Sequence, residues 1–190
     1  MGIITQDRAL SVGNVSGAVA TIAAGGTVTM LPEYEPRTVT VKLTITELVQ
    51  AVVNGTEHQG TKIFTFPPGH ISIIGCIGSL QQTTTSALAS TLNASSTGRV
   101  SLGTATSANT SLNGADANVA AVAFTSSATI DVAGTAVKLA STALLGTDGS
   151  ATAAALYLNS AFATTGDVDA DATQKWNGTL YITYIVNGDY

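Results

Sequence analysis

The residues best suited to chemistry in this sequence form an alternating run of carboxylates. Asp167, Asp169 and Asp171 occupy every second position of a polar stretch. Carboxylate oxygens at this spacing could bind Ca²⁺, which prefers oxygen ligands. An EF-hand loop also requires Gly at its sixth position and Glu at its twelfth, where this run has Ala172 and Gly178. We therefore expect a solvated acidic loop, with calcium binding as the weaker alternative.

Nucleophilic catalysis has few candidate residues. The chain has two histidines, His58 and His70, and one cysteine, Cys76. A catalytic histidine needs a carboxylate to orient it and a nucleophile to face it, and no Gly-x-Ser-x-Gly elbow is present in the sequence. Cys76 lies in an apolar stretch, which predicts an inert core thiol. We expect no enzyme activity and no cofactor.

One further residue could mark a binding site. Trp176, the single tryptophan, stands in a polar stretch after the acidic run. Exposed aromatic side chains often mark binding surfaces. We expect Trp176 to be exposed, as an interface anchor rather than as a platform for sugars.

Composition limits the partners of the chain. Of its 190 residues, 10% are charged and 5% aromatic, and the net charge is −5. The seven basic residues are scattered singly, which disfavours nucleic acid as a partner. No apolar run is long enough for a membrane helix and no secretory signal begins the chain, so we expect synthesis in a reducing cytoplasm. A weakly charged, hydroxyl-rich surface costs little to desolvate, which favours contact with protein neighbours.

Strands must position all of these residues. Residues 38–46 read TVTVKLTIT and 179–186 read TLYITYIV, both with period-two alternation. The run His70–Leu80 is apolar on both faces, which predicts a central strand covered on both sides. Many short strands with frequent turn signals predict an all-β fold, an antiparallel β-sandwich or jelly-roll-like barrel. Further short strands are expected at 18–22, 27–31, 62–66, 99–102, 119–124, 128–132, 136–140 and 153–162, and 51–53 is a second apolar patch that ends at the turn pair Asn54-Gly55.

The chain divides into an arm and one domain. We expect residues 1–36 to form an extended N-terminal arm and residues 37–190 a single β-sandwich domain. Within that domain, residues 82–150 are rich in Ala, Ser and Thr and should form short strands and loops. A helical turn around 116–123 is left open. Pro32 and Pro36 bracket Glu33, Tyr34 and Glu35, which predicts an acidic turn.

Three segments resemble a group of small virion structural proteins of tailed bacteriophages. They are TQDRALSVGN near the start, KIFTFPPGHISIIGCIGSL in the middle and GTLYITYIVNGDY at the end. In that group a Phe-Pro-x-Gly turn, matched here by Phe66, Pro67 and Gly69, leads into an apolar strand with an internal glycine, here Gly75. The similarity covers both ends and the middle strand pair of the chain.

The resemblance implies a capsid decoration, or cement, protein. Such a protein would bind across major capsid subunits on the outer surface of the virion and stabilise the head, as a homotrimer synthesised in the host cytoplasm. We expect the contacts to involve polar or aromatic groups at chain ends and turns: Asp7, Arg8, Glu33, Tyr34, Glu35, Asp189 and Tyr190. The partners would be the major capsid protein and further copies of the chain, without nucleic acid or membrane.

Other functions stay open at this point. A tail or head-fibre structural module would use the same kind of fold. A carbohydrate-binding module belongs to a different class, and glycan binding by the isolated protein would favour it. An enzyme is the least favoured class, because no convergent set of His, Cys, Asp or Glu is visible.

Overall fold

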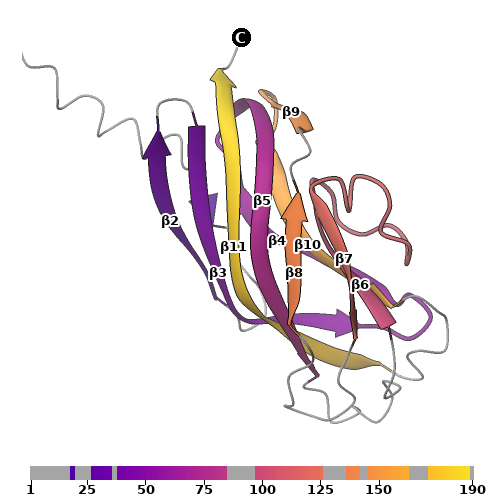
Figure 1. Ribbon diagram of the computed structural model, residues 1–190. Coiled ribbons are helices and arrows are strands. Elements are labelled where there is room, and N and C mark those ends of the chain that lie inside the picture. The colour runs from indigo at the N-terminus through magenta and orange to yellow at the C-terminus, as the bar shows by residue number, and fades with distance from the viewer. Residues whose placement is uncertain are drawn as a thin grey trace, which may run out of the picture.

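The protein is an all-β sandwich of two antiparallel sheets (Figure 1). The computed structural model describes residues 18–19, 27–35, 38–84, 97–125, 136–141, 145–162 and 171–188. Within these ranges every regular element is a strand, so the expected fold class is confirmed and the helical turn around 116–123 is not found. None of the described segments is a helix that could cross a membrane.

Each sheet is built from strands distant in sequence. Sheet A has the order β1-β4-β10-β6-β7, and sheet B has the order β2-β3-β11-β5-β8, with β9 also paired to β5. Figure 1 shows sheet B in front with β11 at its centre and sheet A behind it. The strands are β1 (Ala18–Val19), β2 (Thr27–Glu35), β3 (Thr38–Val52), β4 (His58–Thr65), β5 (Gly69–Thr84), β6 (Thr97–Gly103), β7 (Ala120–Thr125), β8 (Val137–Ser141), β9 (Leu145–Gly149), β10 (Ala155–Phe162) and β11 (Ala172–Gly188). The strand expected at 128–132 lies outside the described residues.

A bulge in β3 extends the first alternating segment. The predicted alternation is confirmed, because Val39 to Ile45 face the core at every second position. Thr46 and Glu47 then stand opposite a single residue of β11, and Glu47 has a φ of 51°. Because of this extra residue, the side chains that face the core change from odd-numbered to even-numbered positions. As a result Leu48, Gln50 and Val52 continue the buried face of β3, and the apolar patch at 51–53 contains the end of that strand.

Strand β11 begins earlier than expected and buries the tryptophan. It starts at Ala172, where the sequence suggested a polar loop, and pairs with β3 and β5 along its length. Trp176 is 0% exposed, so the expectation of an exposed anchor was wrong. Counting back in steps of two from the inward-facing Leu180 places Trp176 on the same buried face.

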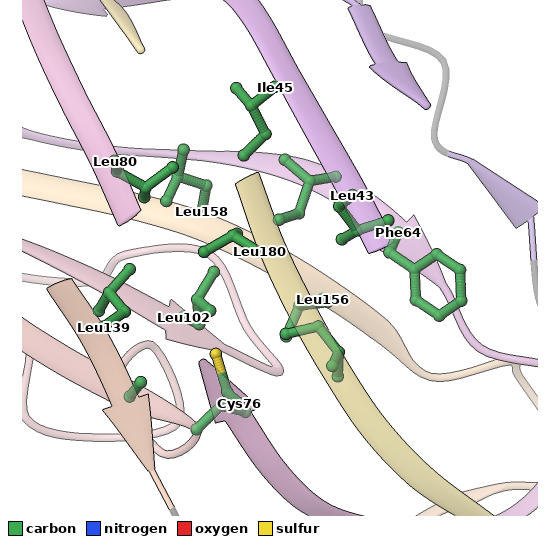
Figure 2. Packing of buried hydrophobic residues seen from close by; sticks show 14 of the residues in the cluster. Leu43, Ile45, Phe64, Cys76, Leu80, Leu102, Leu139, Leu156, Leu158 and Leu180 are labelled. Atoms are coloured by element: carbon green, nitrogen blue, oxygen red, sulfur yellow. The ribbon is translucent and has the colours of Figure 1, made fainter. Parts of the chain in front are cut away.

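The core between the sheets is leucine-rich in its middle and aromatic at two places. Figure 2 shows Leu43, Leu156, Leu158 and Leu180 meeting there from both sheets. One aromatic cluster joins Phe64, Phe66 and Tyr184, with Phe66 and Tyr184 edge to face at 5.0 Å. The other joins Phe124, Phe162 and Trp176, with Phe124 and Trp176 at 5.0 Å. Edge-to-face pairs of this kind add stability beyond the area they bury.

A buried polar cluster ties the two sheets together beside Trp176. Gln50 Oε1 accepts hydrogen bonds from Trp176 Nε1 at 2.9 Å and from Ser160 Oγ at 2.7 Å. Gln50 Nε2 donates to the Leu158 carbonyl oxygen at 2.9 Å. Gln174 Nε2 donates to Ser160 Oγ at 2.7 Å. Because Gln50, Gln174 and Trp176 belong to sheet B and Ser160 and Leu158 to sheet A, these bonds fix the position of one sheet on the other.

Replacing Gln50 with Leu should destabilise the fold by about 3 kcal/mol, because the indole N–H and the Ser160 hydroxyl lose their shared buried acceptor. Urea denaturation followed by the fluorescence of the single tryptophan measures this change. Replacing the exposed Lys62 with Ala is the control, and we expect a change within about 0.5 kcal/mol. Equal stabilities of the two variants would show that the cluster contributes little.

Candidate interaction surface

Most of the predicted contact and metal residues lie outside the part of the chain that the structure describes. Outside the described residues lie Asp7, Arg8, Asp167, Asp169, Asp189 and Tyr190. Asp171 is exposed, and its Oδ1 accepts a hydrogen bond from the backbone N–H of Asn54 at 3.0 Å. In the structure Asp171 therefore holds the turn between β3 and β4.

Glu33, Tyr34 and Glu35 lie in a strand rather than in the expected turn. Strand β2 runs through Glu35 and pairs with β3, with Glu33 opposite Thr40. Proline is tolerated in β2 because the strand is at the edge of sheet B, where one side needs no ladder hydrogen bonds. That these three residues make contacts stays a prediction.

The two histidines lie apart and make different local contacts. His58 Nδ1 lies 3.2 Å from Ser107 Oγ. His70 Nδ1 lies 3.7 Å from Asp148 Oδ1, and both side chains are exposed. Hydrogen bonds from Ser150 are the main cause that lowers the pKa of Asp148. Among the described residues no three His, Cys, Asp or Glu side chains gather in a group that could hold a metal ion.

The segment between β6 and β7 covers the outer face of sheet A. Asn159 points to that face yet is 0% exposed. Its Nδ2 donates to the carbonyl oxygens of Ala105 and Asp116, and its Oδ1 accepts from Ser107 N–H at 3.0 Å. Ser101 Oγ also donates to the Asp116 carbonyl oxygen, at 2.6 Å. The pair of His58 and Ser107 belongs to this attachment, so a structural role accounts for it.

The outer face of sheet B has no such cover among the described residues. Its centre is a row across four strands, in which the register aligns Lys42, Tyr181, Ile77 and Ala140. Ile77 is 63% exposed and Tyr181 38% exposed. Lys42 Nζ lies 5.9 Å from the centre of the Tyr181 ring, within the range of a cation–π contact. We call this row and the residues on either side of it the sheet B face.

Hydroxyl groups flank the central row. The next row on one side aligns Thr40, Thr183 and Gly75, and the Thr40 and Thr183 hydroxyls are 3.0 Å apart. A shallow groove of about 280 Å³ opens over this row and the central one. It is lined by Gly75, Cys76, Ile77, Ala140, Ser141, Tyr181 and Thr183. Exposed apolar groups, hydroxyls and the Lys42 ammonium beside the Tyr181 ring together suit a contact with another protein.

The exposed Ile77 corrects the expectation for His70–Leu80. Strand β5 is a central strand, as expected, but the described residues cover only its inner face. From the apolar run alone, a strand covered on both faces cannot be distinguished from one with an exposed outer face. The signal that sequence reasoning missed is the cross-strand pairing of Ile77 with Tyr181, because each looks unremarkable in its own strand.

Comparisons with known proteins give distant structural similarities. No protein-family model and no curated protein matches the chain. One solved structure, that of infectious bursal disease virus, Gt strain, has 14% identity over 92% of this chain and 38% of its own, with a TM-score of 0.40. The decameric BFDV capsid protein has 14% identity over 78% of this chain and 99% of its own, with a TM-score of 0.35.

Cys76 lies beneath the sheet B face and points into the core. It is 5% exposed, and Figure 2 shows it among the buried leucines near Leu102 and Leu139. Desolvation by burial raises the pKa of its thiol to about 12. The expected burial of this thiol in the core is confirmed, and its low reactivity stays a prediction.

The thiol should therefore react slowly with thiol-specific reagents in the folded protein. At pH 8 an aromatic disulfide reagent should label Cys76 only as fast as the protein unfolds, and labelling should be immediate in concentrated urea. Since the folded pKa is raised, the stabilisation that this group provides is complete below its unfolded pKa of about 9 and is lost as pH rises toward 12. Rapid labelling of the native protein, at a rate independent of urea, would contradict this burial.

Proposed function

We propose that the protein is a non-enzymatic structural protein of the virion, which decorates the capsid of a tailed bacteriophage. The observation that carries the proposal is the sheet B face, an exposed strand surface with Ile77 and Tyr181 at its centre. An exposed apolar row on an otherwise tightly packed sandwich favours a second protein surface as its natural cover.

The physical character of this face supports an assembly role. Threonine and serine surround the central row, and burying hydroxyls that find new partners costs less than burying charges. Tyrosine is enriched at the centres of protein interfaces, where it contributes a large apolar area and one polar group. Many copies of a modest contact on one particle add up to strong attachment.

The residues that carry the family resemblance have structural roles that fit it. Phe66 is 1% exposed and packs against Phe64 and Tyr184. Pro67 is buried. Gly69 has a φ of 107°, a backbone conformation that residues with a Cβ atom rarely adopt. This turn leads the chain from sheet A to sheet B, so these residues build the sandwich rather than a reactive centre.

In this proposal the protein acts mechanically. It binds across neighbouring major capsid subunits on the outer surface of the head, as a homotrimer made in the host cytoplasm. Residues 1–17, with Asp7 and Arg8, extend toward a neighbouring subunit and add a strand to its sheet edge. Asp189 and Tyr190 make further contacts at the other terminus.

Mass spectrometry of purified virions, with copy numbers per particle, tests the proposal. We expect copies on the scale of the shell subunits. A handful of copies per particle would indicate a tail or fibre component instead, and absence from virions would overturn the proposal. Glycan binding by the isolated protein, together with absence from virions, would favour a carbohydrate-binding module.

Deleting residues 1–17 should abolish binding to capsids that lack the protein, because the extension supplies the reach between subunits. Strands β1 and β2 begin after the deletion, so the circular dichroism spectrum and the urea midpoint should stay unchanged. Co-sedimentation of purified protein with the capsids measures the loss. Full retention on capsids would show that the extension is not needed for attachment.

A further inference from the structure

Asn-Gly pairs occur four times in the sequence, at 54–55, 113–114, 177–178 and 187–188. The fold holds these pairs in different ways. We propose that Asn54 is a site of spontaneous deamidation, and that the backbone and its hydrogen bonds protect the other three asparagines. This modification is a property of the chain itself, beyond the proposed function and independent of it.

The reaction needs a backbone nitrogen that can reach the side chain of the preceding asparagine. That nitrogen loses its proton and attacks the side-chain amide carbon, and the amide group leaves as ammonia. The product is a five-membered succinimide ring. Water then opens the ring at either carbonyl carbon, which gives aspartate or isoaspartate, whose main chain runs through the side-chain carbon. A following glycine favours the attack because no Cβ atom obstructs rotation of its peptide plane.

The turn after β3 leaves Asn54 and Gly55 open to this reaction. Both residues are exposed. Apart from its chain neighbours, no atom of the described residues lies within 4 Å of the place that a Cβ atom at Gly55 would take. The bonds that close the turn run from the N–H groups of Thr56 and Glu57 to the Val53 carbonyl oxygen, at 3.1 and 3.0 Å. Neither of these bonds uses the Gly55 nitrogen, so they do not hold the peptide plane that must rotate.

Asn177 is held in the central ladder of sheet B. The following Gly178 pairs with Ile45 of β3 and with Leu80 of β5. Rotation of this peptide plane would therefore break the sheet on both sides. Asn177 Oδ1 also accepts a hydrogen bond from the Glu47 N–H at 2.8 Å, which fixes the side chain. Groups in the middle of a ladder are exposed to solvent only when a large part of the protein opens.

Asn187 lies near the end of the same strand, β11. Its Nδ2 donates to Ser72 Oγ at 2.7 Å, and the following Gly188 pairs with His70 of β5. The ends of a ladder open more readily than its centre. We therefore expect Asn187 to react more slowly than Asn54 and faster than Asn177.

Asn113 lies in the segment between β6 and β7, where both residues of the pair are exposed. Here the Gly114 N–H donates to Asp116 Oδ1 at 2.9 Å. Asp116 is only 3% exposed, and its Oδ2 also accepts from the Ala108 N–H, at 3.4 Å. The nitrogen that would attack is thus bound to an anchored carboxyl group, which opposes the loss of its proton.

Deamidation of Asn54 would weaken the link between this turn and β11. The backbone N–H of Asn54 donates to Asp171 Oδ1 at 3.0 Å, one residue before β11 begins. The product places a new carboxylate in the turn and adds one negative charge to a chain whose net charge is already −5. Neighbouring carboxylates repel each other, and isoaspartate also lengthens the main chain of the turn.

Peptide mapping during incubation of the folded protein at pH 8 tests the proposal. Trypsin releases residues 43–62 with Asn54, residues 100–138 with Asn113, and residues 176–190 with the other two pairs. Mass spectrometry measures the conversion of amide to acid at each asparagine, and chromatography separates the two isomeric products. We expect Asn54 to react about tenfold or more faster than Asn177, because an exposed turn opens far more often than a central ladder.

Controls separate the effect of the fold from that of the sequence. In concentrated urea all four pairs are unfolded and should react at similar rates. Asn54→Gln should stop the reaction at this position, because attack on the longer side chain requires a six-membered ring. Asn113→Gln is the matched variant and should leave the rate at Asn54 unchanged. Incubation should lower the urea midpoint of the wild-type protein, and Asn54→Gln should remove most of this decrease.

Equal rates at the four pairs in the folded protein would overturn the proposal, as would a first reaction at Asn113 or Asn177. An unchanged urea midpoint after complete conversion of Asn54 would overturn the inferred weakening of the contact with Asp171. These measurements use the isolated protein, so neither result depends on whether it is found in virions.

Discussion

The pairing of β11 with two long strands is the constraint on which the other features depend. Its 17 residues are hydrogen-bonded to β3 on one side and to β5 on the other. Once this central ladder is in register, the alternation of side chains along each strand determines which of them enter the core and which form the outer face. A slip of one residue would exchange Leu180 and Ile182 for Tyr181 and Thr183, and would bury hydroxyls while exposing leucine.

The inter-sheet polar cluster complements this ladder. Leucine packing tolerates small shifts of one sheet over another, because apolar contacts have no direction. Gln50 and Ser160 make directional bonds between the sheets, and their geometry accepts only one offset. The cluster and the aromatic group around Trp176 lie together, so fixed geometry is concentrated in one part of the sandwich.

The sequence allowed the fold class and the main alternation to be predicted, because β-branched residues at every second position have few other interpretations. Val39 to Ile45 and Leu180 to Tyr184 face the core as period two requires. The bulge at Glu47 was missed, since a single residue in the left-handed region leaves no hydrophobic signature. Trp176 was misplaced because its polar neighbours, which face outward or join the buried cluster, resemble those of a loop. The sheet B face could not be foreseen, because it depends on which strands become neighbours.

The divided border of sheet B has a consequence for solubility. Strands β8 and β9 each contribute only five residues, and their pairing with β5 stops at Ile73 and resumes at Cys76. A long, flat border would offer a continuous template for fibril growth, whereas short and offset border strands do not. Lys138, exposed on one of the two, adds a desolvation penalty to any such stacking. This border of sheet B is therefore a poor template for amyloid-like polymerisation.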